Sequence, residues 1–128
     1  MTSSVRDALA ELRLLTQGCR ANILIVGHLH PSECDDLLET IKAHCEQDVF
    51  HAQRQPTDLA LPDGGDRIVV LDAVCELSRH QQRQLLRWLS EHKAVIVSFA
   101  SRSVYDMVCE GRFSDRLYYH LNTLCIML

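Results

Sequence analysis

Short runs of apolar residues alternate along the chain with longer segments in which apolar residues recur every three or four positions. The runs Ile23–Val26, Ile68–Leu71 and Ala94–Val97 are continuously apolar. Runs of this kind are typical of strands that are buried on both faces of a parallel sheet. Two weaker runs, Val49–Phe50 and Leu124–Ile126, predict two further strands.

The amphipathic segments between these runs predict helices over about 5–18, 32–45, 78–89, 104–110 and 114–121. Ser78 and Gln81 have the spacing of a capping box, and Ser32 with Asp35 is expected to begin the second helix in the same way. Residues 52–66 are rich in turn-forming residues and predict a loop.

Strands that alternate with helices indicate an α/β fold, because each parallel connection must cross back over the sheet. We therefore expect a three-layer sandwich with a mainly parallel five-stranded sheet. Ligands of such sheets bind beyond the C-terminal ends of the strands. Here these ends place Gly27, Asp72 and the segment 98–101 at one edge.

Length and charge limit the possible functions. The 128 residues are enough for one domain, residues 1–128, and the formal net charge of −4 argues against a large nucleic-acid-binding face. No apolar stretch is long enough to span a bilayer and the N-terminus has no apolar signal core, so we expect a cytoplasmic protein without a membrane partner. The six scattered cysteines are expected to be reduced core thiols.

Four segments resemble one family of ATPases. The segment EGRFSDRLYYHLN (110–122) closely resembles the EGRFREDLYYRLN signature of sigma-54-dependent transcription activators, a branch of the AAA+ ATPases. Residues 71–89 resemble that family's LDEIGELPLxxQxKLLRxL segment, which contains Walker B. Residues 21–33 resemble its ANVLIxGESGTGK strand and Walker A loop, and 95–108 its sensor I strand with the following helix. The resemblance implies a P-loop ATPase core without the helical lid.

The positions that the resemblance assigns to ATP binding carry other residues. The first loop glycine is present as Gly27, but the GTGK positions are His30, Pro31, Ser32 and Glu33. A working loop needs backbone amides that hold phosphates and a Lys that reaches them. Proline lacks the amide hydrogen, and the Lys position is an acid.

The positions that the resemblance assigns to hydrolysis have changed as well. Asp72 keeps the Walker B aspartate, but the glutamate that orients water is replaced by Ala73. The sensor I asparagine falls at Ser101, and the two arginine fingers fall at Ser114 and His120. The expectation is therefore that the chain is not an enzyme and has no catalytic residue. The family's GAFTGA loop, which contacts sigma-54, is also missing from the interval 46–66, so we do not expect the chain to remodel sigma-54 directly.

Residues of two kinds are left as candidates for function. Gly27, Ser32 and Asp72 are the remnants of a nucleotide site. Arg79, Arg83 and Arg87 form a basic stripe at four-residue spacing, which is either a solvated helix face or a contact for an acidic partner. Tyr118 and Tyr119 are expected to pack a helix against the sheet, or else to lie at a subunit contact.

A metal site is a further alternative near the first strand, where His28, His30, Glu33 and Cys34 crowd one loop. Because no remote ligand can be identified and Glu33 is suited to cap the following helix, no metal is expected.

The leading functional hypothesis is a non-catalytic regulator or adaptor that contacts a protein partner, either a sigma-54 activator or a second copy of itself, with no cofactor and no direct nucleic acid. The alternative is a domain that binds ATP or ADP without hydrolysing it. A receiver-like phosphorylation switch, with Asp72 as phosphoacceptor, lacks the acidic pair expected after the first strand, where Val26 and Gly27 stand.

Overall fold

A computed structural model describes residues 22–44, 48–63 and 68–127. Its strands are β1 (Ile23–Val26), β2 (Val49–Arg54), β3 (Leu59–Ala60), β4 (Ile68–Leu71), β5 (Val95–Ala100) and β6 (Leu124–Met127). The helices are α2 (Pro31–His44), the short 3₁₀ helix η1 (Val74–Glu76), α3 (Arg79–Glu91), α4 (Val104–Cys109) and α5 (Asp115–Leu121). The predicted helix over 5–18 lies outside the described residues.

The strands form one sheet in the order β3-β2-β4-β5-β1-β6. The five predicted strands run parallel to one another, which confirms the expected α/β architecture. The sixth, β3, pairs antiparallel with the end of β2 at the edge of the sheet. It lies in the segment predicted to be a loop. That prediction was wrong here because turn formers at 55–58 join two short paired strands, and Gln84 fixes both backbone groups of Leu59.

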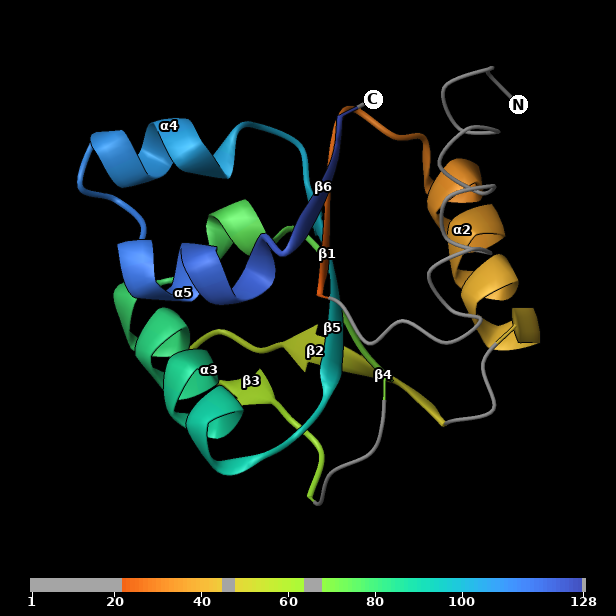
Figure 1. The fold of residues 1–128 in the computed structure, drawn as a ribbon, viewed down its shortest axis with the longest axis horizontal. Coiled ribbons are helices and arrows are strands. Elements are labelled where there is room, and N and C mark those ends of the chain that lie inside the picture. The colour runs from red at the N-terminus through yellow and green to blue at the C-terminus, as the bar shows by residue number, and fades with distance from the viewer. Residues whose placement is uncertain (1–21, 45–47, 64–67, 128) are drawn as a thin grey trace.

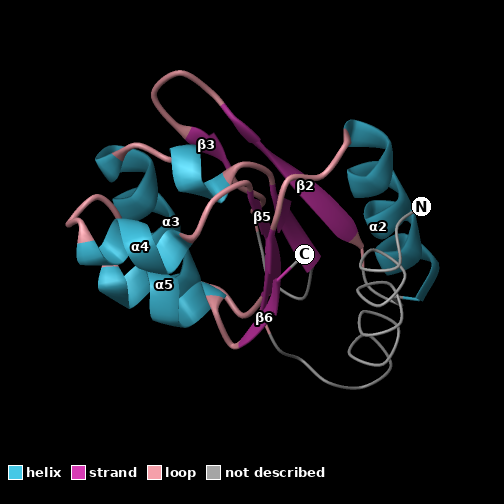
Figure 2. Cartoon of the chain, turned by 90° about the horizontal axis from the view of Figure 1, so that it is seen from above, coloured by secondary structure: helices cyan, strands magenta, loops and turns pink. Residues whose placement is uncertain are grey.

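The sheet is the middle layer of three (Figures 1 and 2). The described helix α2 covers one face, and α3, α4 and α5 cover the other. Alternate residues of each strand face opposite layers, so Ile23 and Ile25 pack toward α2, whereas Leu24 and Val26 pack toward α3 and α5. Because both faces of the sheet are buried against apolar side chains, the strands are continuous apolar runs in the sequence.

The ends of the described predicted helices lie within two residues of their predicted bounds. Ser78 and Gln81 form the predicted capping box of α3. Ser103 caps α4 and Ser114 caps α5, each through its hydroxyl oxygen. The start of α2 differs, because the helix begins at Pro31, so Ser32 lies inside it and does not cap it. Proline suits the first helical position, since its fixed φ is helical and an amide there has no helical partner.

The thiols were expected in the core, and this is only partly correct. Cys75 is buried and Cys34 is half-buried, but Cys109 and Cys125 are exposed, at the end of α4 and on the edge strand β6. Cys19 and Cys45 lie outside the described residues. No helix among the described residues is long and apolar enough to cross a membrane.

Candidate functional site

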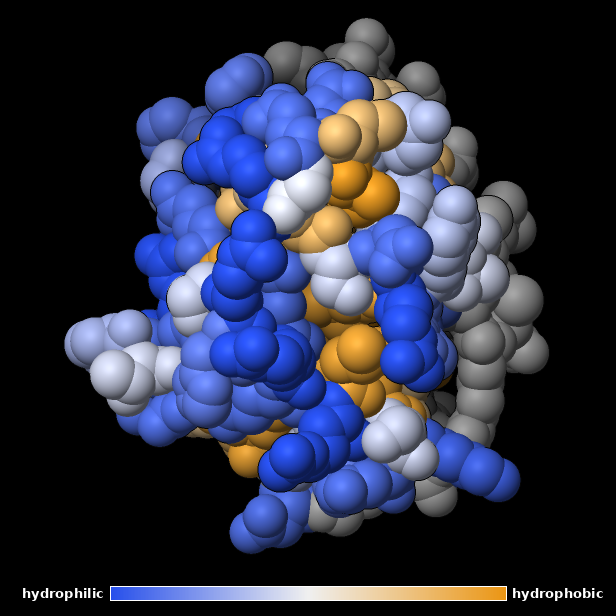
Figure 3. Space-filling view, turned by 90° about the vertical axis from the view of Figure 1, so that its left-hand side faces the viewer, coloured by the Kyte–Doolittle hydropathy of each residue, from blue (hydrophilic) through white to orange (hydrophobic). Residues whose placement is uncertain are grey.

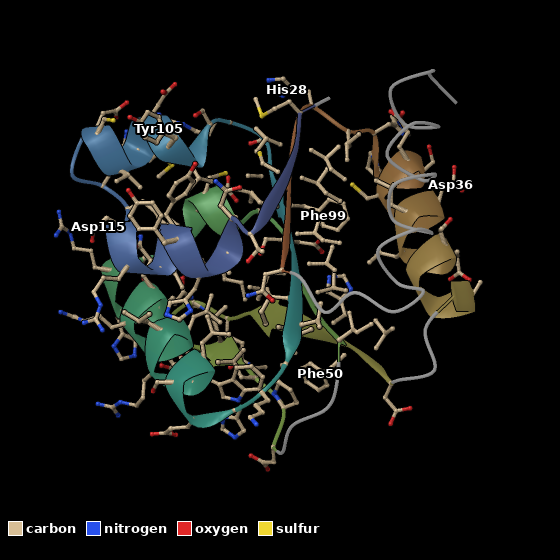
Figure 4. All side chains as sticks on the ribbon, viewed as in Figure 1. His28, Asp36, Phe50, Phe99, Tyr105 and Asp115 are labelled. Atoms are coloured by element: carbon tan, nitrogen blue, oxygen red, sulfur yellow. The ribbon has the colours of Figure 1, made fainter. Side chains whose placement is uncertain are left out.

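An open depression of about 420 Å³ lies at the C-terminal ends of β1, β4 and β5. Its walls are formed by the end of β5, by residues just after β1, β4 and β5, by the first turns of α2 and by one residue of β2: Gly27, His28, Leu29, Pro31, Cys34, Asp35, Leu38, His51, Asp72, Ala73, Phe99, Ala100 and Ser101. Figure 4 labels His28 at this edge of the sheet and Phe99 below it. The parallel register brings Gly27, Asp72 and Ser101 together as predicted, but Ser98 lies inside β5, and neither Ser98 nor Ser32 is part of the wall.

At the start of α2, two side chains accept hydrogen bonds from neighbouring backbone amides. The Glu33 carboxylate accepts a hydrogen bond from the His30 amide at 3.2 Å, as in a capping box. The Nδ1 atom of His30 accepts one from the Ser32 amide at 3.3 Å and lies 2.9 Å from the Ser32 hydroxyl. The His30 carbonyl accepts the amides of Glu33 and Cys34. This confirms that Glu33 caps the helix, and it shows that His30 does so too.

Asp72 lies at the end of β4, where the sequence placed it, and is paired with a histidine. The Nε2 atom of His51 is 2.5 Å from the Asp72 carboxylate, and both side chains are partly exposed. His51 belongs to β2, next to β4 in the sheet. Sequence reasoning missed His51. The only available signal was a polar residue inside the short apolar run Val49–Ala52.

The residue after Asp72 has an unusual backbone. Ala73 adopts the left-handed conformation, with φ 48° and ψ 48°, and precedes η1. This conformation costs a non-glycine residue about 1–2 kcal/mol. Its methyl side chain also lines the depression, at the position that the family resemblance assigns to a water-orienting glutamate.

Two carboxylates, those of Asp35 and Asp72, line the depression near Cys34. Burial raises the pKa of the Cys34 thiol, and the carboxylates of Asp72 and Asp35 raise it further. Cys34 is therefore held as a neutral thiol at neutral pH. Within the described part of the chain, no three His, Cys, Asp or Glu side chains are placed to hold a metal ion.

Ser101, Ser114 and His120 stand at the positions that the family resemblance assigns to sensor I and to the arginine fingers. Each of them makes contacts within the fold. Ser101 is exposed at the rim of the depression, and its hydroxyl lies 3.7 Å from the Cys75 sulfur. Ser114 accepts the amide of Leu117 at the start of α5. His120 is exposed, and its carbonyl accepts a hydrogen bond from Asn22.

Gln82 joins the two most family-like segments, and sequence reasoning did not select it. Its side chain is 5% exposed. The amide nitrogen donates to the carbonyls of Leu77 and Arg112 at 3.1 and 3.2 Å, and its oxygen accepts the Ser114 amide at 2.9 Å. The available signal was its place at the glutamine of the quoted LDEIGELPLxxQ pattern, three residues before the apolar Leu85.

The predicted interaction residues lie on the opposite side of the sheet from α2. Arg79, Arg83 and Arg87 are all exposed on α3, and Arg79 donates to the Gly111 carbonyl at 3.1 Å. Figure 3 shows this face as mostly hydrophilic, with an apolar strip between the polar side chains.

The two tyrosines of α5 behave differently. Tyr118 is half-buried, with its ring 6.0 Å from that of Tyr105, and its hydroxyl accepts a hydrogen bond from Asn122. Burial raises the pKa of its phenol. Tyr119 is 72% exposed, so the expectation that both rings pack the helix against the sheet was wrong for Tyr119. The reason is that it follows Tyr118 directly and therefore points to another side of α5.

Comparisons with known proteins agree with this architecture. The sigma-54 interaction domain family matches residues 29–128. NtrX from Brucella abortus in complex with ADP superimposes with a TM-score of 0.76 at 16% identity, covering 98% of this chain and 36% of NtrX. The ATP complex of NtrX gives 0.74 at 17% identity, covering 99% and 36%.

A more distant fold relative is RIF2 from Saccharomyces cerevisiae, with a TM-score of 0.58 at 11% identity, covering 100% of this chain and 56% of RIF2. No curated protein sequence matches the chain. The chain thus spans about a third of the length of NtrX. The family match covers most of the chain, and the five parallel strands have the arrangement of the AAA+ P-loop core. The chain therefore belongs to the sigma-54 interaction domain family.

Proposed function

We propose that this chain is a non-catalytic member of its family and that it regulates transcription through contacts with protein partners. One observation carries the proposal: the amides at the start of α2 are bonded to the chain's own His30 and Glu33. A helix N-terminus binds phosphate only when its amides are free to point at the ligand. A triphosphate would have to displace these bonds and would approach the Glu33 carboxylate.

The residues around the depression do not fit a triphosphate for a second reason, which is charge. Among the described residues, the wall carries Asp35 and no Lys or Arg, and its other carboxylate, Asp72, stands at the position that the family resemblance assigns to Mg²⁺ binding. Burial raises the pKa of the Cys34 thiol, and the carboxylates of Asp72 and Asp35 raise it further. Phosphate oxygens in this position would lack the cation that the Lys of a working loop supplies.

The partner that the family suggests is a sigma-54 activator, and a second copy of this chain is the other candidate. An inactive domain that occupies a subunit position would lower the activity of an assembly that depends on its neighbours. The test is to add the purified chain to a sigma-54 activator from the same host and to measure ATP turnover. We expect turnover to fall at least twofold at equimolar concentrations. Unchanged turnover at a tenfold excess would contradict the proposal for this partner.

A nucleotide-binding sensor is the second candidate, and one observation favours it. The depression lies at the sheet edge where parallel α/β sheets bind ligands, and Gly27 and Asp72 still line it. A thermal-shift titration with Mg·ATP and Mg·ADP separates the two candidates. Ligand at a hundred times its dissociation constant would add about 2.7 kcal/mol of stability, which corresponds to a shift of several degrees.

A further inference from the structure

Four arginines lie on two neighbouring elements of the layer opposite α2, and we call this surface the arginine face. It consists of Arg79, Arg83 and Arg87 on α3 and Arg116 on α5, all exposed. The hydrogen bonds of Gln82 fix the segment just before α5 against α3, so the start of α5 has a fixed position beside α3. Figure 4 shows this side of the molecule, with Asp115 labelled at the start of α5.

Within the described part of the chain, the arginines of this face lack the ion pairs that Arg54, Arg102 and Arg112 make. Arg54 pairs with Glu76, and Arg102 and Arg112 pair with Glu110. Among the described residues, Arg83, Arg87 and Arg116 have no carboxylate within ion-pair distance.

The carboxylates nearest in sequence leave an excess of positive charge on the face. The Asp115 carboxylate accepts the Arg116 amide, and Glu91 follows Arg87 by one helical turn and forms no ion pair with another described residue. The arginine face is therefore positive on a chain whose formal net charge is −4.

The stability of α3 does not explain this arrangement. Like charges four residues apart destabilise a helix by about 0.2–0.5 kcal/mol per pair, and α3 contains two such pairs along its stripe. Arg79 also stands at the N-terminal end, where the helix dipole disfavours a cation, and the first turn has no acidic residue. Both features lower the stability of the isolated helix, and both would favour a negatively charged partner.

We propose that the arginine face binds an acidic helical segment of a partner protein, with carboxylates spaced one turn apart. Successive arginines of α3 rise about 6 Å along the helix axis, which matches Glu or Asp side chains at four-residue spacing on a partner helix. The guanidinium fork suits carboxylates in a bidentate geometry. Tyr119, which is 72% exposed on α5, adds an aromatic side chain to the same element as Arg116. The proposal names a contact surface for the regulatory function above and rests on it.

A protein segment fits this face better than a nucleic acid does. Nucleic-acid-binding domains are usually basic overall, whereas this chain has an isoelectric point of about 5.9. Its overall charge would repel a long polyanion. A short acidic helix meets only the local positive face, because charges beyond about 8–10 Å are screened at physiological salt.

The test uses a synthetic, fluorescently labelled helical peptide with three Glu residues at four-residue spacing. Its affinity is measured by fluorescence anisotropy for the full chain, for Arg83→Gln with Arg87→Gln, and for a control with Arg54→Gln and Arg102→Gln. Both double variants lose the same charge, but the control arginines lie outside the arginine face. We expect the first double variant to bind at least tenfold more weakly and the control to change less than twofold.

Three results would overturn the proposal: no binding of the peptide at low salt, equal loss in both double variants, or tighter binding of a single-stranded oligonucleotide of equal charge. Circular dichroism checks that each variant is folded. The proposed function fails separately. If the peptide does not bind but the chain still lowers the activator's ATP turnover, the regulatory function stands and the arginine face is not its contact surface.

Discussion

Replacing Gln82 by alanine is predicted to destabilise the chain by about 2–4 kcal/mol. The side chain makes three hydrogen bonds to backbone groups, and each contributes about 0.5–1.5 kcal/mol. Alanine would leave the Leu77 and Arg112 carbonyls and the Ser114 amide without this partner at a position that is 5% exposed. The lost methylene packing adds to the cost.

The assay is urea denaturation followed by circular dichroism and by the fluorescence of Trp88, the chain's only tryptophan. Trp88 reports on the same helix, because it is buried in α3 and donates to the Pro62 carbonyl. The matched control is Arg83→Ala at the next, exposed position, which is expected to change stability by less than about 0.5 kcal/mol. If Gln82→Ala costs no more than this control, Gln82 does not hold the loop before α5 in place.

Three other predictions concern single residues. Ala73→Gly should leave stability unchanged or raise it by up to about 1 kcal/mol, because the left-handed backbone of Ala73 favours glycine. Ala73→Val should lower stability by more than about 1 kcal/mol. Urea denaturation measures both variants, and a larger loss for glycine than for valine would refute this. Ser98→Ala should be neutral or stabilising by up to about 1 kcal/mol, since the buried hydroxyl has no hydrogen-bond partner among the described residues, and a loss above about 1 kcal/mol would reveal a partner. Cys34 should react slowly with iodoacetamide at pH 8 and faster in an Asp72→Asn variant, because burial and then the Asp72 carboxylate raise its pKa. Mass spectrometry of the labelled peptide measures the two reaction rates. Equal rates would exclude an electrostatic contribution of Asp72.

The strands and most helices could be predicted from sequence because their physical causes are local. Apolar runs buried on both faces and serine caps at 78, 103 and 114 depend on residues close in the chain. The strand β3 could not be predicted this way, because its backbone groups are fixed by Gln84 from a distant helix. The cap at His30 was missed for another reason, since histidine is an uncommon cap and Ser32 offered a better match to the usual pattern.

The candidate site was predictable only where the family pattern or the strand ends pointed to it. Gly27 and Asp72 lie where the parallel sheet brings strand ends together. The pairing of His51 with Asp72 depends on the neighbouring positions of β2 and β4, which the sequence of neither strand reveals. The exposure of Tyr119 likewise depends on which side of α5 packs against α3 and α4.

Whether the start of α2 is closed to phosphate can be tested by a thermal-shift titration with Mg·ATP on two proteins. One is the natural chain, and the other is a variant in which the four residues 30–33 are replaced by Gly, Thr, Gly and Lys. The variant removes the bonds of His30 and Glu33 and supplies free amides and a cation. We predict no shift for the natural chain up to millimolar nucleotide and a shift of several degrees for the variant. A shift of several degrees for the natural chain would contradict the claim that the start of α2 is closed to phosphate.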